Sequence, residues 1–121
     1  MLNDEQLKIK DLCAKFPYGL IVSYIDAETN ETVITKLFGV SGTRMFDQFG
    51  MIPDNLKALL RPLSSMSDEE KVEYNEACLK DKESKVAHYA SDWCDEHHFD
   101  QRGLIEKGLA IETGKRIYKN N

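Results

Sequence analysis

The backbone of this chain changes state sharply within one stretch, Leu60-Arg61-Pro62-Leu63-Ser64-Ser65-Met66-Ser67-Asp68-Glu69-Glu70. Pro62 fixes its own φ angle and pushes Arg61 out of the helical region. Serines follow the proline, and Ser67 with Glu70 matches the capping box that starts an α-helix. The stretch therefore predicts a break at the proline and a surface helix that begins after Ser67 and runs to about Lys80.

The N-terminal segment carries the signals of a first helix. Asn3 and Gln6 fit a second capping box, and Pro17 ends the helical pattern. Between them, apolar residues recur at i, i+3, i+4 and i+7. This spacing predicts one apolar stripe, made of Ile9, Leu12, Cys13 and Phe16.

The next third of the chain favours strands. Residues 20–25 and 32–40 are rich in aliphatic and β-branched side chains and flank a short polar segment, which predicts a β-hairpin. We expect a third short strand within residues 44–52. One or two helical turns are then expected from Pro53 through Leu60.

After the helix that Ser67 starts, the pattern predicts a further helix near residues 85–97, with Trp93 as a core anchor. Residues 102–107 favour a last helical turn capped by Gly108, and a short strand is expected at 109–111. The expected fold is a single α+β domain over residues 1–121, of which 115–121 form a flexible tail. It consists of an N-terminal helix, a β-hairpin or small antiparallel sheet, and two or three packed helices.

Composition and charge narrow the class of protein. The 121 residues are 41% hydrophobic and 31% charged, which is ordinary for one globular domain. The net charge is −5, so generic binding to nucleic acid is disfavoured, because phosphate contacts need concentrated positive charge. A weaker interpretation is contact with nucleic acid through four basic residues near the C-terminal end, Lys107, Lys115, Arg116 and Lys119.

The cysteines and the charged residues near the N-terminus indicate the cellular compartment of the protein. Cys13, Cys78 and Cys94 are widely spaced and form no Cys-x-x-Cys pair, which predicts reduced, mostly buried thiols in a cytoplasmic protein. Asp4 and Glu5 lie where a signal peptide would carry basic residues. No apolar run approaches the roughly 20 residues of a membrane span, so no membrane partner is expected.

Chemically active side chains are densest in residues 92–100. Thiolate and imidazole groups bind zinc, and residues four apart share one face of a helix. One hypothesis is therefore a metal-assisted hydrolase or nuclease that uses Cys94, His97, His98 and Asp100. The preferred interpretation is that His97 packs on the apolar face of its helix, while His98 and Asp100 bond the backbone where the helix ends. No catalytic residue is assigned and no cofactor is expected.

Two arginines are candidates for binding a partner. A guanidinium can hold a carboxylate or phosphate through two parallel hydrogen bonds, so Arg61 and Arg102 could each grip an acidic group of a partner. The internal alternative is that either arginine pairs with Asp100 or bonds exposed carbonyls at a helix end.

Three segments of the chain, residues 11–19, 60–70 and 98–110, resemble a family of small uncharacterised proteins from gut-bacterial phages and mobile elements. Residues 27–55 lie outside this resemblance. The family carries no established activity, so the resemblance implies only that the gene travels on mobile DNA. With no catalytic motif marked, we expect a non-enzymatic interaction or accessory module. It would bind a protein partner through its surface helices, and association between copies of the chain stays open.

Overall fold

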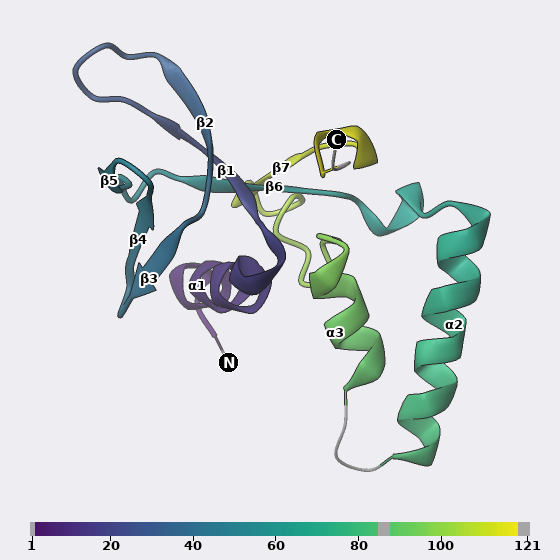
Figure 1. Ribbon diagram of the computed structural model, residues 1–121. Helices are drawn as coiled ribbons and strands as arrows, with labels where there is room; N and C mark the ends of the chain where they lie inside the picture. Colours follow the sequence, from purple (N-terminus) through teal and green to yellow (C-terminus); the bar gives the residue numbers. More distant parts are fainter. Residues whose placement is uncertain (1, 85–87, 119–121) are drawn as a thin grey trace.

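The computed structural model describes residues 2–84 and 88–118, and this part of the chain forms an α+β fold with two sheets (Figure 1). In chain order its elements are α1 (Asp4–Lys15), the 3₁₀ turn η1 (Phe16–Tyr18), β1 (Ile21–Ile25), β2 (Thr32–Lys36), β3 (Gly39–Ser41), β4 (Arg44–Asp47), β5 (Gly50–Met51), β6 (Lys57–Leu60), η2 (Leu63–Ser65), α2 (Asp68–Glu83), α3 (Tyr89–Glu96), β7 (Ala110–Glu112) and η3 (Lys115–Tyr118).

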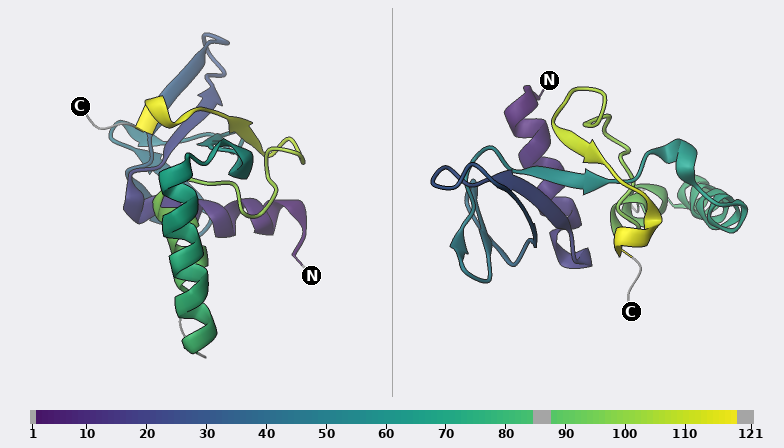
Figure 2. Two further views of the ribbon diagram at one scale, coloured as in Figure 1. Left: turned by 90° about the vertical axis from the view of Figure 1, so that its right-hand side faces the viewer. Right: turned by 90° about the horizontal axis from the view of Figure 1, so that it is seen from above.

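The larger sheet has the strand order β2-β1-β6-β7. Strands β2, β1 and β6 pair antiparallel, whereas β6 and β7 pair parallel. Side chains on one face of this sheet, including Val22, Ala58, Leu60 and Ala110, pack in one buried cluster with Leu12 of α1. Helix α1 therefore closes the core over that face (Figure 2).

The smaller sheet is the antiparallel meander β3-β4-β5. Met45 of β4 and Ile52, which follows β5, are buried in the same core cluster. The meander lies at the end of the molecule opposite to α2, as the views from the front and from above agree (Figures 1 and 2).

Helices α2 and α3 lie side by side and project away from the sheets (Figures 1 and 2). Ser67 caps α2 through the predicted capping box, in which its side chain accepts from the Glu70 N–H and the Glu70 carboxylate accepts from the Ser67 N–H. Along α2 only Glu70 and Ala77 are buried. The helix is therefore a surface element, as predicted from the sequence.

The α+β class and the order of helix, strands and helices are confirmed. The expected helical turns up to Leu60 are wrong, because residues 57–60 form the strand β6 between β1 and β7. A strand that is buried on both faces reads as a continuous apolar run, which periodicity cannot separate from a short helix. The strand pairing depends on distant residues, because Ala58 pairs with Val22, 36 residues upstream, and with Ala110, 52 residues downstream.

The buried face of α1 also differs from the expected one. The capping box at Asn3 is present, but the buried positions are Lys8, Asp11, Leu12 and Lys15. Cys13, expected in the apolar stripe, is exposed, and Cys78 is only partly buried. Three of the four buried α1 side chains are charged, so hydropathy could not locate this face.

Smaller corrections concern the ends of elements. Residues 39–40 belong to β3 rather than to the hairpin strand, and the region 44–52 holds two strands instead of one. Residues 102–107 form turns, not a helical turn, although Gly108 has the expected positive φ of 75°. The predicted strand at 109–111 is present as β7. Trp93 is half-buried rather than a core anchor.

The predicted C-terminal tail is partly described. Its first four residues form η3, and Tyr118 is packed against the larger sheet. Residues 119–121 lie outside the described part, as does the start of the helix expected from residue 85. Within residues 2–84 and 88–118, no helix is both long and apolar enough to cross a membrane.

Candidate functional site

The three segments that carry the resemblance meet at one place, which we call the polar junction. The Arg61 N–H donates to the His98 carbonyl, and the Asp100 N–H donates to the Arg61 carbonyl, both at 2.9 Å. The His98 ring nitrogen Nε2 lies 2.6 Å from the Tyr18 carbonyl oxygen. These bonds join the end of β6, the end of α3 and the turn after α1.

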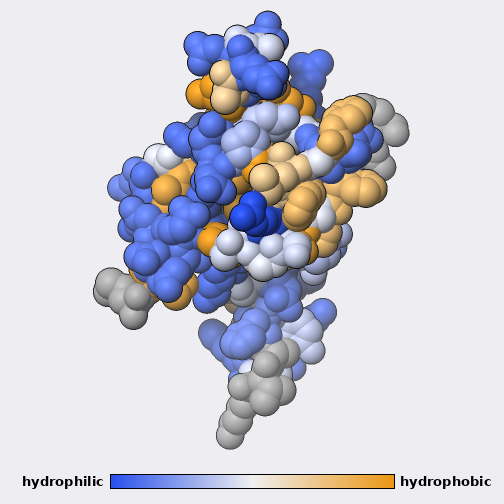
Figure 3. Space-filling view, turned by 90° about the vertical axis from the view of Figure 1, so that its left-hand side faces the viewer, coloured by the Kyte–Doolittle hydropathy of each residue, from blue (hydrophilic) through white to orange (hydrophobic). Residues whose placement is uncertain are grey.

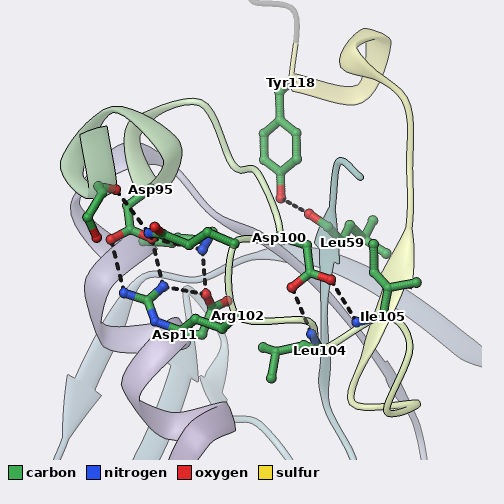
Figure 4. Close-up of polar contacts among 11 residues, drawn as sticks. Asp11, Leu59, Asp95, Asp100, Arg102, Leu104, Ile105 and Tyr118 are labelled. Carbon is green, nitrogen blue, oxygen red and sulfur yellow. Dashed lines mark hydrogen bonds and ion pairs between the residues drawn. The ribbon is translucent and has the colours of Figure 1, made fainter. Parts of the chain in front are cut away.

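One half of the polar junction is a buried ionic cluster of Asp11 and Lys15 from α1 with Asp95 and Arg102 (Figure 4). Lys15 Nζ donates to Asp11 and, at 2.9 Å, to Asp95. Arg102 donates to Asp11 at 2.7 Å and to both oxygens of Asp95 at 2.8 and 3.3 Å. Gln101 adds a bond to Asp95 at 3.1 Å. Two cations therefore face two carboxylates, and the cluster is balanced in charge.

The Asp95 carboxylate stays ionised within this cluster. Burial opposes its ionisation, yet the hydrogen bonds from Arg102 and Lys15 outweigh the desolvation and hold its pKa below the usual value. Burial lowers the pKa of Arg102, but its hydrogen bonds to Asp95 and Asp11 outweigh this effect and raise the pKa above its usual value. The cluster joins α1 to the end of α3, so its role in the described structure is to fix these two elements relative to each other.

The second half of the polar junction is the pair of Arg61 and Glu70. The guanidinium donates to both oxygens of Glu70 at 2.8 Å, and both side chains are buried. The guanidinium carbon also lies 4.1 Å from the centre of the Phe99 ring, a cation–π contact. Hydrogen bonding from Arg61 lowers the pKa of Glu70 to about 2.

This shift predicts an acid-dependent loss of stability. A carboxyl whose folded pKa lies below its unfolded value stabilises the fold above the unfolded pKa and loses that contribution as the pH falls through the folded value. For Glu70 the window runs from the ordinary 4.5 down to about 2. We expect the difference in unfolding free energy between the wild type and Glu70→Gln to shrink across this window, as measured by urea denaturation from pH 6 to pH 2. A constant difference would contradict the assigned pairing.

His98 ends α3 in a conformation that usually belongs to glycine. Its φ is +64°, the Phe99 N–H donates to the Cys94 carbonyl at 2.8 Å, and the His98 N–H donates to the Asp95 carbonyl at 3.2 Å. These two bonds are those of a Schellman motif. The imidazole compensates for the backbone strain through its bond to Tyr18 and by stacking on the Tyr118 ring, with centroids 3.6 Å apart.

Asp100 and Tyr118 complete the polar junction (Figure 4). The Asp100 carboxylate accepts the N–H groups of Leu104 and Ile105 at 2.8 and 2.9 Å, which shapes the turn after α3. The Tyr118 hydroxyl donates to the Leu59 carbonyl at 2.5 Å and accepts the Ile21 N–H at 3.0 Å. Tyr118 therefore ties η3 across β1 and β6.

Of the four side chains in the metal hypothesis, His97, His98 and Asp100 each have partners of their own, and Cys94 is a buried thiol. His97 stacks on Trp93, and its Nδ1 donates to the Trp93 carbonyl at 2.9 Å. His98 Nε2 faces a carbonyl and must carry its proton, and burial lowers the pKa of His98 to about 4. Burial raises the pKa of Cys94 to about 11, so it remains a neutral thiol.

Both oxygens of the fourth candidate, Asp100, accept backbone N–H groups. Among residues 2–84 and 88–118, no three histidine, cysteine or acidic side chains form a group that could hold a metal ion. The geometry therefore lends the hydrolase or nuclease hypothesis no support, and it matches the interpretation in which His98 and Asp100 bond the backbone at the end of a helix.

The two arginines predicted to bind a partner both form ion pairs within the molecule. Arg61 is 3% exposed and pairs with Glu70, while Arg102 is partly buried and pairs with Asp11 and Asp95. Neither pairs with Asp100, the internal partner that the sequence suggested. The sequence analysis did not find Asp11 and Lys15, whose i,i+4 spacing of opposite charges was the one local signal.

Comparison of the chain with protein-family models, with curated proteins and with solved structures gives no match. Similarity therefore assigns no family, activity or partner, and the resemblance to the phage family stays a prediction. Within the polar junction each charged or imidazole group has an internal partner, so its chemistry is that of a scaffold. A contact surface has to be sought elsewhere on the molecule.

Proposed function

We propose that this protein is a non-enzymatic interaction module, an accessory factor of a phage or mobile element that binds another protein. The observation that carries the proposal is a gathering of large apolar side chains in solvent on the small sheet. Phe38, Phe49 and Met51 are 68%, 86% and 57% exposed. Soluble monomers rarely expose large apolar patches, and patches of this kind often mark surfaces that bind another protein.

The three residues are close together in the small sheet, since Phe38 directly precedes β3, Phe49 lies in the β4–β5 turn and Met51 belongs to β5. Phe46 pairs with Met51 across β4 and β5, and the Phe38 N–H donates to the Phe46 carbonyl at 2.8 Å. Arg44 reaches the Met51 sulfur at 2.9 Å. Hydrophobic side chains gather around a strongly hydrophilic group on this end of the molecule (Figure 3). Aromatic residues, methionine and arginine are the types enriched where proteins meet.

This surface differs from the one that the sequence suggested. The helices were expected to make the contact, yet the most exposed aromatic side chain, Phe49, lies in the β4–β5 turn. Turns and loops that a rigid sheet positions commonly carry binding residues. The small sheet is thus the favoured face for a protein partner with an apolar patch of its own.

Site-specific photo-crosslinking tests the proposal in the cells that encode the protein. We expect Phe49→benzoylphenylalanine to give one discrete crosslinked species, identified by mass spectrometry, whereas Thr29→benzoylphenylalanine in an exposed turn gives none. The purified partner should then bind the Phe49→Ser, Met51→Ser variant at least tenfold more weakly than the wild type, because interface aromatics are common hot spots. Equal crosslinking from both positions, or unchanged affinity, would refute the proposed face.

A further inference from the structure

The larger sheet has a second face, opposite to the one that α1 covers. Val22 and Ala58 pack with Leu12 of α1, and in Figure 1 the three α-helices of the described chain all lie below this sheet. Because successive side chains of a strand point to opposite sides, the neighbours of Val22 and Ala58 point away from α1, to a side that we call the outer face. The cross-strand register places nine side chains on the outer face: Thr32, Ile34, Lys36, Ile21, Ser23, Ile25, Lys57, Leu59 and Ile111.

Isoleucine side chains are exposed to solvent on the outer face. Ile25, Ile34 and Ile111 are 49%, 59% and 41% exposed. Ile25 and Ile111 line one hollow, and Ile34 lies opposite Ser23, which lines the same hollow. An antiparallel sheet that faces water on one side usually carries polar residues there. The outer face instead has the composition of a surface that another element covers.

The hollow on the outer face has a volume of about 160 Å³ and contains an unused polar group. Ser23 lines it and is only 6% exposed. The Ser23 hydroxyl makes no hydrogen bond within residues 2–84 and 88–118. Buried hydroxyl groups are normally hydrogen-bonded, so a ligand that brings an acceptor into the hollow would satisfy this one.

The charges of the outer face are positive, although the chain as a whole has a net charge of −5. Its two charged side chains are Lys36 and Lys57, and neither forms an ion pair in the described part of the chain. Lys57 lies directly opposite Ser23 in the ladder of β1 and β6, a position in which the Cβ atoms are about 5 Å apart. The ammonium and hydroxyl groups are both donors, and a carboxylate offers two acceptor oxygens. Charge complementarity therefore selects an acidic occupant.

The position of the hollow favours a helix over an added strand. A strand would pair at an edge of the sheet, along β2 or β7, whereas Ser23 and Lys57 belong to the two inner strands. A helix lies across a sheet face, as α1 does on the other side. An amphipathic helix also presents a carboxylate beside aliphatic side chains, because residues three and four apart share one face.

We propose that the outer face binds an acidic amphipathic helix of a partner protein. One carboxylate of that helix enters the hollow and accepts hydrogen bonds from Ser23 and Lys57. The aliphatic side chains of the helix pack on the three exposed isoleucines. The outer face shares no residue with the apolar face of the small sheet, so the two proposals succeed or fail independently.

Three alanine-based helical peptides of about five turns serve as probes. The first carries leucine along one face with glutamate beside it; the second has glutamine for each glutamate, and the third has alanine for each leucine. We expect the first peptide to shift the backbone amide signals of Ser23, Lys57 and Ile111 in ¹⁵N-resolved NMR spectra of the full chain. It should bind at least tenfold more tightly than either of the others, because only it offers both the carboxylate and the aliphatic side chains.

Two double variants, whose NMR spectra also report whether they are folded, test the assigned residues. Ser23→Ala, Lys57→Gln should weaken binding of the leucine–glutamate peptide at least tenfold and remove the preference for glutamate over glutamine. Ser64→Ala, Lys71→Gln, at exposed positions near the start of α2, should change the affinity by less than twofold. The proposal is overturned if this peptide does not bind or if both variants weaken it equally. It is also overturned by shifts confined to the edge strand β2, which would indicate strand addition, or by concentration-dependent shifts without peptide, which would indicate a second copy on the outer face.

Discussion

Asp95→Asn is expected to lower the free energy of unfolding by about 3–5 kcal/mol, the cost of removing one partner from a buried ion pair. Asparagine keeps the shape of the side chain but removes its charge, which leaves Lys15 and Arg102 facing Asp11 alone. Lys15 is 0% exposed, so it has no access to water as a substitute. Urea denaturation monitored by Trp93 fluorescence measures the loss, and Asp92→Asn on the exposed side of α3 should change stability by less than about 0.5 kcal/mol.

A paired replacement separates charge balance from simple damage. Asp11→Leu with Lys15→Met removes one anion and one cation and leaves Asp95 and Arg102 as a balanced pair. Replacing a complete buried pair by apolar residues is often close to neutral. It also removes Asp11 Oδ2, which is buried without a hydrogen-bond partner in the described residues. A double variant as unstable as Asp95→Asn would show that packing, not charge, dominates at this cluster.

The local signals in the sequence were sufficient to place the starts of α1 and α2. The capping boxes at Asn3 and Ser67 depend on residues three apart, so they can be identified without knowing the fold. The same Glu70 that caps α2 also pairs with Arg61, nine residues upstream on the other side of a proline. Nothing in the linear pattern distinguishes a capping glutamate from one that holds a buried arginine as well.

The buried charges explain why the face of α1 was mispredicted. Hydropathy assigns Lys15 and Asp11 to the solvent, and Asp95, which pairs with Lys15, lies 80 residues beyond it. Because burying a charge is costly unless it is paired, the prediction of this face required knowing that a carboxylate arrives from another element. The strand β6 was missed for a related reason, since its neighbours in the sheet come from distant parts of the chain.

For the candidate site too, the local signals in the sequence were informative and the contacts between distant residues were not predicted. The sequence drew attention to the correct segments, because the stretches around Arg61 and His98 meet in the polar junction. The sequence did not predict the roles of Arg61 and Arg102, since both arginines pair with carboxylates other than Asp100. The exposed apolar face depends on which side chains the fold leaves in solvent. That property is decided by packing and not by spacing along the chain.

Arg61→Met should also destabilise the protein by about 3–5 kcal/mol, because it leaves the Glu70 carboxylate buried without its cation. The variant further loses the contact of the guanidinium with the Phe99 ring. We expect its loss to shrink as the pH is lowered below 4.5, since protonation of Glu70 then removes the unpaired charge. Denaturation curves at pH 7 and at pH 4 measure this change.

The double variant Arg61→Met, Glu70→Gln tests the cause, because the glutamine amide keeps the capping bond to the Ser67 N–H while removing the charge. The double variant should be more stable than Arg61→Met at pH 7 but not at pH 2, where Glu70 is protonated in the single variant. Such a result would show that the unpaired carboxylate is the main cause of the lost stability. If the second substitution instead adds to the loss at pH 7, the pair contributes through packing and hydrogen bonds, and the low pKa of Glu70 is not what stabilises the junction.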